Sequence, residues 1–412
     1  MGSRTSRPSD SSSISGPPRL PFDIYLQIPS HLRPWLVEDR ETLLALARCC
    51  RALRDASQKV LFTSMRYGHL PIDPDRRLLR QLTVQSTFLR AVVDSPDRLA
   101  LYVNVFSQDK LALDPEFRST AFTKHKRKRA QLWTLTKQAL PLMVNLKKLN
   151  FAPVVNHPSA PILLQRCTFQ LESLVWRGVG SETALYATFL PTQYNLLHLN
   201  INSHQHLDRP RLPDGLCPSL LSIACLLSDL SHICAKRPII GLHVTANSRG
   251  DIAEPPCTDL MSAAEREGCL AALEKVKTLR LWSVSQFHRS TSGTVLRMIV
   301  ALELRVWEAE DTSLLVQFPN LRSLQLWDHS RSDDNSSISP DTAARVFTQC
   351  NKLQKLIIVN AHSGHKRRFS RGGFDKNPLY KENQNAESQD SLCGTAANQS
   401  AKRVYHPTEY SP

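Results

Sequence analysis

The chain has 412 residues, of which 41% are hydrophobic, so its length allows two or three domains with a sizeable core. Its 52 Lys and Arg against 37 Asp and Glu give a formal net charge of +15, which favours polyanions or acidic protein surfaces as partners. We find no signal-peptide pattern, no apolar window that suits a membrane span and no C-x-x-C pair among the ten cysteines, so we expect reduced thiols in the cytoplasm, the nucleus or both.

The first predicted elements are three short helices that follow a Ser-, Arg- and Pro-rich tail at 1–18, which we expect to be disordered. Ile24 and Ile28 lie one helical turn apart, and Pro21 stands where a first-turn proline is tolerated. Two further apolar rows follow, with Leu43, Leu46, Ala47 and Cys50 in one and Leu53, Ala56, Val60 and Leu61 in the other. A unit of roughly 45 residues cannot bury all of these, so part of its apolar surface should dock on something else.

Residues 19–64 resemble an F-box in the form common among fungal proteins. The matching residues, in order, are Leu20, Pro21, Asp23, Ile24, Ile28, Leu43, Leu46, Cys49, Arg51 and Leu53, with Leu61-Phe62 as the usual closing pair. The resemblance implies a three-helix domain that clamps a Skp adaptor through Leu20, Pro21, Ile24, Ile28, Leu43, Leu46 and Leu53. The alternative is a plain three-helix hairpin that packs into the next domain.

Residues 65–145 have a mixed pattern, and we expect a linker region with both helix and strand. Alternating apolar residues predict a strand at 99–106, and 130–144 has the pattern of a helix. The basic run Lys124–Arg129 precedes that helix. It is interpreted as a nuclear-import signal, a nucleic-acid patch or the solvated start of the helix.

From residue 146 the pattern L-x-x-L-x-L recurs, where L is any large apolar residue. Copies start at Leu146, Leu171, Leu196, Ile239, Val276, Ile299, Leu321 and Leu353, and helix-like segments separate several of them. Residues 216–234 carry apolar residues at helical spacing, and we expect a core-facing helix there.

The region 146–361 resembles a degenerate leucine-rich-repeat array of the kind found behind F-boxes. The resemblance implies an α/β fold of short parallel strands with return helices, in which positions 1, 4 and 6 face the core and positions 3, 5 and 7 line a concave sheet face. The alternative is an ordinary α/β domain whose strands share this pattern.

The predicted concave face contains candidate client-binding residues, because exposed tryptophan and arginine are frequent binding hot spots. They are Arg280, Trp282, Arg305, Gln325, Trp327 and Lys355. A register shifted by one would instead place both tryptophans in the core. We expect the tail at 362–412 to be disordered. It contains a second basic run, His365–Arg368, and a site for a basophilic kinase at Ser370.

Catalytic and cofactor motifs are missing from the sequence: it has no phosphate-binding glycine motif, no nucleophile elbow and no H-E-x-x-H. His198, His204 and His206 could share a metal in principle, but we predict no metal, no cofactor and no catalytic residue. The resemblance implies a non-catalytic substrate-recognition subunit of a Skp–cullin–F-box ubiquitin ligase that binds a client protein, without a small-molecule substrate or membrane partner. The alternative is a nuclear scaffold or nucleic-acid-associated protein that acts through its basic runs.

Overall fold

The computed structural model describes residues 21–34, 36–65, 74–109, 111–113, 125–153, 160–177, 182–201, 212–245, 263–291, 293–308, 310–329, 338–361 and 366–371. The chain divides into two compact units, Met1–Pro71 and Ile72–Pro412. In the part of the chain that is described, no helix combines the length and apolarity needed to cross a membrane.

The N-terminal unit consists of three helices, α1 (Phe22–His31), α2 (Val37–Cys49) and α3 (Arg51–Thr63), as the apolar rows predict. Helix α3 contacts both α1 and α2. Pro21 precedes the first helical residue, and its carbonyl accepts a 3.0 Å hydrogen bond from the Ile24 amide. The Arg33 amide donates a 2.9 Å hydrogen bond to the Asp39 carboxylate, which ties the link between α1 and α2 to the first turn of α2.

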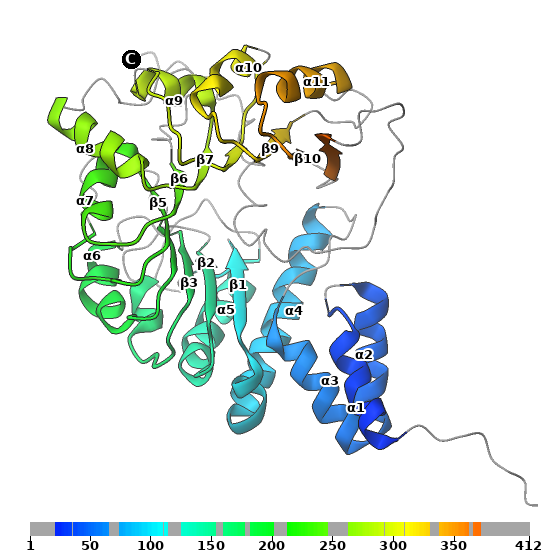
Figure 1. The fold of residues 1–412 in the computed structure, drawn as a ribbon. Helices are drawn as coiled ribbons and strands as arrows, with labels where there is room; N and C mark the ends of the chain where they lie inside the picture. The colour runs from blue at the N-terminus through cyan, green and yellow to red at the C-terminus, as the bar shows by residue number, and fades with distance from the viewer. Residues whose placement is uncertain are drawn as a thin grey trace, which may run out of the picture. The chain divides into compact units, whose positions relative to one another are not determined.

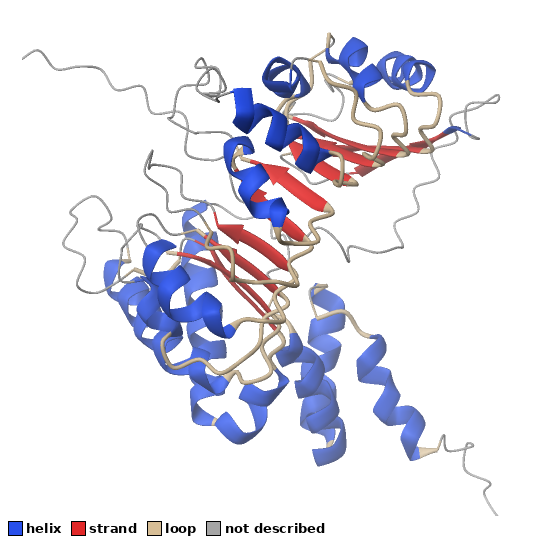
Figure 2. Cartoon of the chain, turned by 60° about the vertical axis from the view of Figure 1, so that its left-hand side comes forward, coloured by secondary structure: helices blue, strands red, loops and turns tan. Residues whose placement is uncertain are grey.

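The C-terminal unit is an α/β domain with an eleven-stranded sheet whose strand order follows the chain. Strands β1 to β10 are parallel, and β11 pairs antiparallel with β10. The strands are Val105–Asp109, Lys148–Ala152, Ser173–Trp176, His198–Ile201, Ser222–Cys225, Gly241–Val244, Thr278–Leu281, Ala301–Leu304, Ser323–Asp328, Lys355–Asn360 and Lys366–Ser370. Helices cover one face of this curved sheet, as Figures 1 and 2 show.

The helices of this unit are α4 (Pro74–Asp94), α5 (Lys126–Ala139), α6 (Glu182–Ala184), α7 (Leu230–Ala235), α8 (Ala263–Leu273), α9 (Val284–Thr291), α10 (Asp311–Leu314) and α11 (Pro340–Gln349). Ser339 caps α11, because its hydroxyl accepts a 3.2 Å hydrogen bond from the Thr342 amide. Elsewhere single 3-10 or π turns connect the strands, at Pro96–Ala100, Leu140–Leu142, Ala160–Leu164, Leu185–Phe189, Leu190–Thr192, Leu227–Asp229 and Leu315–Gln317.

The core lies between the sheet and its helices, and it is built from the apolar positions of the repeated pattern. Each of the eight predicted copies contains a strand that starts two residues after the first apolar residue of the copy, for example β2 at Lys148 after Leu146. The first and fourth residues of every copy are buried. Aromatic residues continue from layer to layer, since the rings of Phe151 and Trp176 are stacked with centroids 5.1 Å apart. The predicted strands and their register are therefore confirmed.

Two strands lie where the sequence led us to expect something else. Strand β5 (Ser222–Cys225) falls inside the predicted helix 216–234, of which only the end is helical, in α7. The prediction is wrong because Leu220 and Ile223 fit both a helical row and the repeated pattern. Strand β1 (Val105–Asp109) belongs to the sheet, although we assigned it to a linker region and expected the strand at 99–106. Its sixth pattern position is Gln108, which is fully buried.

The prediction of a disordered C-terminal tail is wrong for residues 366–370, because they form strand β11. Arginines on this segment hold it in place. The Arg367 guanidinium lies 3.6 Å from the buried Asp328 carboxylate, and Arg371 donates hydrogen bonds to the carbonyls of Phe347 and Cys350 at the end of α11. The other residues of the predicted tail lie outside the described residues, except for Arg371, which follows the strand.

Candidate protein-binding surfaces

The N-terminal unit exposes several large apolar side chains on and next to its first two helices. Ile24, Tyr25, Ile28, Leu36 and Leu44 are between 37% and 43% exposed. We call these five residues the α1–α2 apolar surface. Five large apolar side chains exposed on so small a unit give this surface the composition of a docking site.

The predicted adaptor-binding residues fall into three groups. Pro21, Ile24 and Ile28 are exposed, whereas Leu46 and Leu53 are half-buried. Leu43 is fully buried, so it is a core residue and does not present its side chain to a partner in this structure. Leu20 lies outside the described residues. The sequence analysis missed Tyr25, Leu36 and Leu44, although Leu44 directly follows the row to which Leu43 belongs.

The C-terminal unit offers a second surface, the polar face of the sheet, which lies opposite the helices. We define it as the third, fifth and seventh positions of each pattern copy and the residues of β11 that share their side. Because the strands are parallel and in register, these positions form rows across adjacent strands. In one such row Arg280 lies beside Glu303, and Glu303 lies beside Gln325.

A cluster around Glu303 occupies this face on β7, β8 and β9. Glu303 Oε1 accepts hydrogen bonds from the Arg280 guanidinium and, at 2.7 Å, from the Trp327 indole. Arg305 Nε lies 3.6 Å from the same oxygen, and the Arg305 guanidinium carbon is 4.1 Å from the centre of the Trp327 ring. The Arg280, Glu303 and Arg305 side chains are only 15–20% exposed. Cation–π and charge-assisted contacts of this kind are stronger when they are partly removed from water.

The electrostatic effect of this cluster extends to β6. His243 is aligned with Arg280, and burial together with the charges of Arg280, Arg305 and Arg177 lowers the pKa of His243 to about 3. The imidazole is therefore neutral at physiological pH. Arg177 itself pairs with Asp109 at 3.5 Å.

The two tryptophans proposed for this face have different environments. Trp282 is 40% exposed, whereas Trp327 is only 4% exposed. The alternative of a shifted register is wrong, because the fourth and sixth positions of both copies, Leu279, Leu281, Leu324 and Leu326, are buried in the core. Trp327 is buried since Glu303 binds its indole and Arg305 lies against its ring. The prediction that Trp327 is available to a client is therefore wrong in this conformation.

The other predicted face residues are only partly brought together. Half-buried Gln325 lies beside Glu303, but Lys355 is exposed at the start of β10, one row away from the cluster. Glu303 and His243 were not predicted to belong to this surface. The sequence indicates their place on the polar face only through their fifth position in a pattern copy.

The basic runs contribute to two surfaces. On β11, Lys366 aligns with Val359 and Arg368 with Ile357, so these two cations share the polar face with Lys355. In the first run, Lys126, Arg127 and Lys128 are exposed at the start of α5 and Arg129 is buried. This arrangement agrees with the solvated start of a helix. Lys124 and His365 lie outside the described residues.

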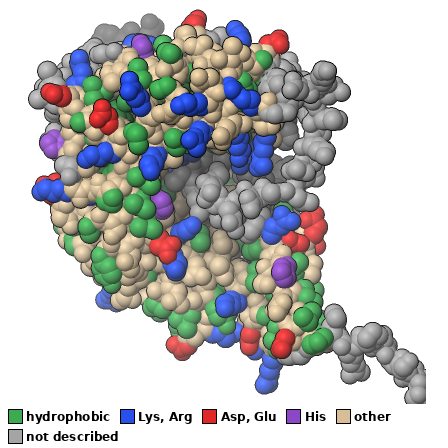
Figure 3. All heavy atoms as spheres, in the orientation of Figure 1, with side chains coloured by type: hydrophobic (Ala, Val, Ile, Leu, Met, Phe, Trp, Pro, Cys, Tyr) green, Lys and Arg blue, Asp and Glu red, His purple; other side chains and the backbone are tan. Residues whose placement is uncertain are grey.

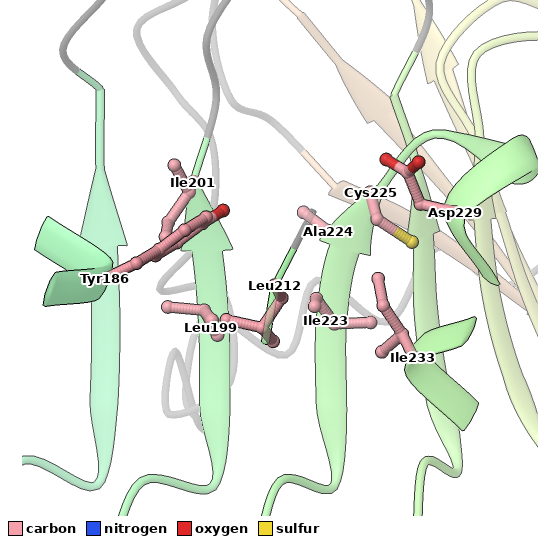
Figure 4. Close-up of a pocket in the computed structure, with 9 residues that line it drawn as sticks. All are labelled: Tyr186, Leu199, Ile201, Leu212, Ile223, Ala224, Cys225, Asp229 and Ile233. Atoms are coloured by element: carbon pink, nitrogen blue, oxygen red, sulfur yellow. The ribbon is translucent and has the colours of Figure 1, made fainter. Parts of the chain in front are cut away.

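A small pocket lies between the sheet and α7, where Tyr186 and Asp229 meet the side chains of β4 and β5 (Figure 4). Its other lining residues are Leu199, Ile201, Leu212, Ile223, Ala224, Cys225 and Ile233. This lining is mostly apolar carbon and continues the core. Among the described residues no group of three or more His, Cys, Asp or Glu could hold a metal, and His204 and His206 lie outside them.

The described cysteines with a shifted pKa are buried, except Cys167, which is half-buried. Burial raises the pKa of the Cys167 and Cys269 thiols to about 12 and that of Cys217, Cys234 and Cys350 to about 11. Such thiols are poor nucleophiles at neutral pH.

No protein-family model matches this chain, and no curated protein matches it either.

Proposed function

We propose that this chain is a substrate-recognition subunit of a Skp–cullin–F-box ubiquitin ligase. In this proposal the N-terminal unit is an F-box that docks the Skp adaptor, and the C-terminal unit is a leucine-rich-repeat-like array that holds a client protein. The α1–α2 apolar surface carries the proposal, because a separate three-helix unit with five exposed large apolar residues suits docking on another protein.

The F-box motif residues support this assignment where the structure describes them. Ile24 and Ile28 are exposed one turn apart on α1, and Tyr25 and Leu44 add to the same apolar surface. Leu43 instead supports the helical core. The adaptor contact therefore centres on α1, the start of α2 and Leu44.

The polar face supports the second half of the proposal. It presents arginines, an exposed tryptophan and half-buried polar residues in aligned rows, which suits a protein client. The mechanism is proximity, since a client that is held near a charged conjugating enzyme reacts at a high effective concentration. This chain contributes binding and no bond chemistry.

Co-purification with the Skp adaptor tests the proposal. The wild-type chain should capture the adaptor, and Ile24→Ser/Ile28→Ser should abolish capture while circular dichroism stays unchanged. The matched control is Val295→Ser/Val316→Ser, which makes the same kind of change at exposed positions of the C-terminal unit and should capture normally. A folded wild-type chain that captures no adaptor would contradict the proposal.

The alternative function, binding of nucleic acid by the basic runs, has the three exposed cations of α5 in its favour. It predicts binding that weakens steeply between low and moderate salt. Lys126→Gln/Arg127→Gln/Lys128→Gln should remove such binding without affecting adaptor capture.

A further inference from the structure

The polar face of β7 to β11 carries an excess of positive charge. Its cations are Arg280, Arg305, Lys355, Lys366 and Arg368, and we call these five residues the basic face. Among the described polar-face residues of these strands, Glu303 is the only carboxylate. Arg280 and Arg305 both lie against this one carboxylate, so these three side chains together carry one net positive charge.

Neighbouring residues add to this charge. Lys277 and Arg322 are exposed directly before β7 and β9, at the same end of the sheet as Lys355. In the view of Figure 3, Lys and Arg side chains gather over the part of the molecule that β7 to β10 occupy, and Asp and Glu side chains are fewer there. Burial is the main cause of the lowered pKa of His243 beside Arg280, and the charges of Arg280 and Arg305 lower it further.

An apolar contact point lies within this charged region. Trp282 is 40% exposed at the seventh position of its copy, next to Arg305 on the neighbouring strand. An indole next to basic residues can bind an apolar side chain of a partner, while the basic residues bind carboxylates of the same partner.

We propose that the basic face binds an extended, acidic segment of the client protein. Strands lie about 4.8 Å apart, so the path from β7 to β11 is roughly 19 Å long. An extended chain advances about 3.3 Å per residue, and the bound segment therefore spans about six residues. The inference rests on the proposed function only in calling the partner a client, because the charge complementarity does not depend on the adaptor.

A protein segment fits this face better than single-stranded nucleic acid. Binding of unpaired nucleotides typically uses several aromatic rings on which successive bases stack. Trp282 is the one exposed aromatic ring among the described polar-face residues of β7 to β11, since Trp327 is buried under Arg305.

Fluorescence polarisation with the full chain and no adaptor tests the proposal. The probe is a fluorescein-labelled peptide of six glutamates, compared with the same peptide in glutamine and with a labelled twelve-nucleotide oligo-dT. Lys355→Gln/Arg368→Gln should weaken binding of the glutamate peptide about tenfold. Both side chains are exposed, so this variant should fold normally.

The control Lys137→Gln/Arg166→Gln removes the same charge from exposed positions of α5 and the loop before β3, and it should stay within twofold of wild type. Trp282→Ala leaves the charge unchanged and should also stay within twofold of wild type, because the glutamate peptide has no apolar side chain to contact this indole. No binding of the glutamate peptide, or equal losses in both charge variants, would overturn the proposal. Oligo-dT binding that is tighter than peptide binding and depends on Lys355 and Arg368 would instead identify nucleic acid as the ligand.

The two proposals can fail separately. The Ile24→Ser/Ile28→Ser variant should lose adaptor capture but should still bind the glutamate peptide with wild-type affinity.

Discussion

The indole nitrogen of Trp327 donates a 2.7 Å hydrogen bond to the carboxylate of Glu303 on the neighbouring strand. The same carboxylate oxygen accepts from Arg280 and faces Arg305, so one acidic side chain organises three partners on β7, β8 and β9. Glu303 thus determines where two arginines and a tryptophan lie on the polar face.

Glu303→Gln should destabilise the chain by about 2 kcal/mol, because two arginines with little exposure lose their shared negative charge while Trp327 keeps an acceptor. Urea denaturation measures this difference. Glu274→Gln, at an exposed glutamate, should change stability by less than about 0.5 kcal/mol. Equal stability of Glu303→Gln and wild type would show that the carboxylate charge is unimportant for the cluster.

His243 predicts a pH dependence of stability. Its pKa is lowered from an ordinary value of 6.5 to about 3 in the folded chain, so the unfolded chain binds more protons between these values. The contribution of this histidine to stability is therefore complete above pH 6.5 and is lost as the pH falls from 6.5 towards 3. Urea denaturation between pH 7 and pH 5 should show a smaller loss for His243→Gln than for wild type. Exposed His232, changed to Gln, is the control and should retain the wild-type slope.

Gln108→Leu tests a buried polar network in the first layer of the sheet. Gln108 Nε2 donates a 2.9 Å hydrogen bond to Gln85 on α4, and its carbonyl accepts a 3.1 Å hydrogen bond from Thr136 on α5. Leucine restores the apolar residue usual at this position, but it removes the buried donor to Gln85, and we expect a loss of about 2 kcal/mol in thermal or urea unfolding.

The control for the network is Gln131→Leu, which makes the same substitution at an exposed position of α5. It should alter stability by less than about 0.5 kcal/mol. A more stable Gln108→Leu variant would mean that apolar burial outweighs these hydrogen bonds.

Ser370→Glu should weaken binding of the glutamate peptide several-fold. Ser370 is exposed on β11 opposite Lys355, and it follows the basic pair Arg367-Arg368 by two residues, as a basophilic kinase requires. A negative charge there competes with an acidic client for Lys355 and Arg368. Ser370→Gln, of the same size without the charge, should bind like wild type in the polarisation assay. Equal affinities for the Glu and Gln variants would argue against control by phosphorylation.

The strands could largely be predicted from sequence because the apolar residues of a half-buried strand alternate in a fixed way. Leu146, Leu149 and Phe151 show this pattern plainly, and the structure buries all three. Strand β5 was missed since Leu220 and Ile223 also satisfy helical spacing. The strand expected at 99–106 was placed several residues before β1, because Gln108 takes an apolar position and is satisfied by two other elements.

The candidate surfaces were less predictable because they depend on contacts between distant residues. The position of Trp327 on the polar face followed from the register, but its burial depends on Glu303 and Arg305. Strand β11 has no strong apolar pattern, and its anchors are Asp328 and the carbonyls at the end of α11. On the N-terminal unit, the apolar rows showed that a surface would remain exposed, but not that Leu43 is interior and Leu44 is outside.

Strand order that follows chain order has a consequence for biosynthesis. Each strand from β2 onward pairs with a strand that the ribosome has already released, so the sheet can grow layer by layer while translation continues. No early strand has to remain open for a partner encoded far downstream. Strand β11 is synthesised last among the described strands and runs against the others, and its Lys and Arg side chains give this end of the sheet an edge that discourages pairing with a second chain.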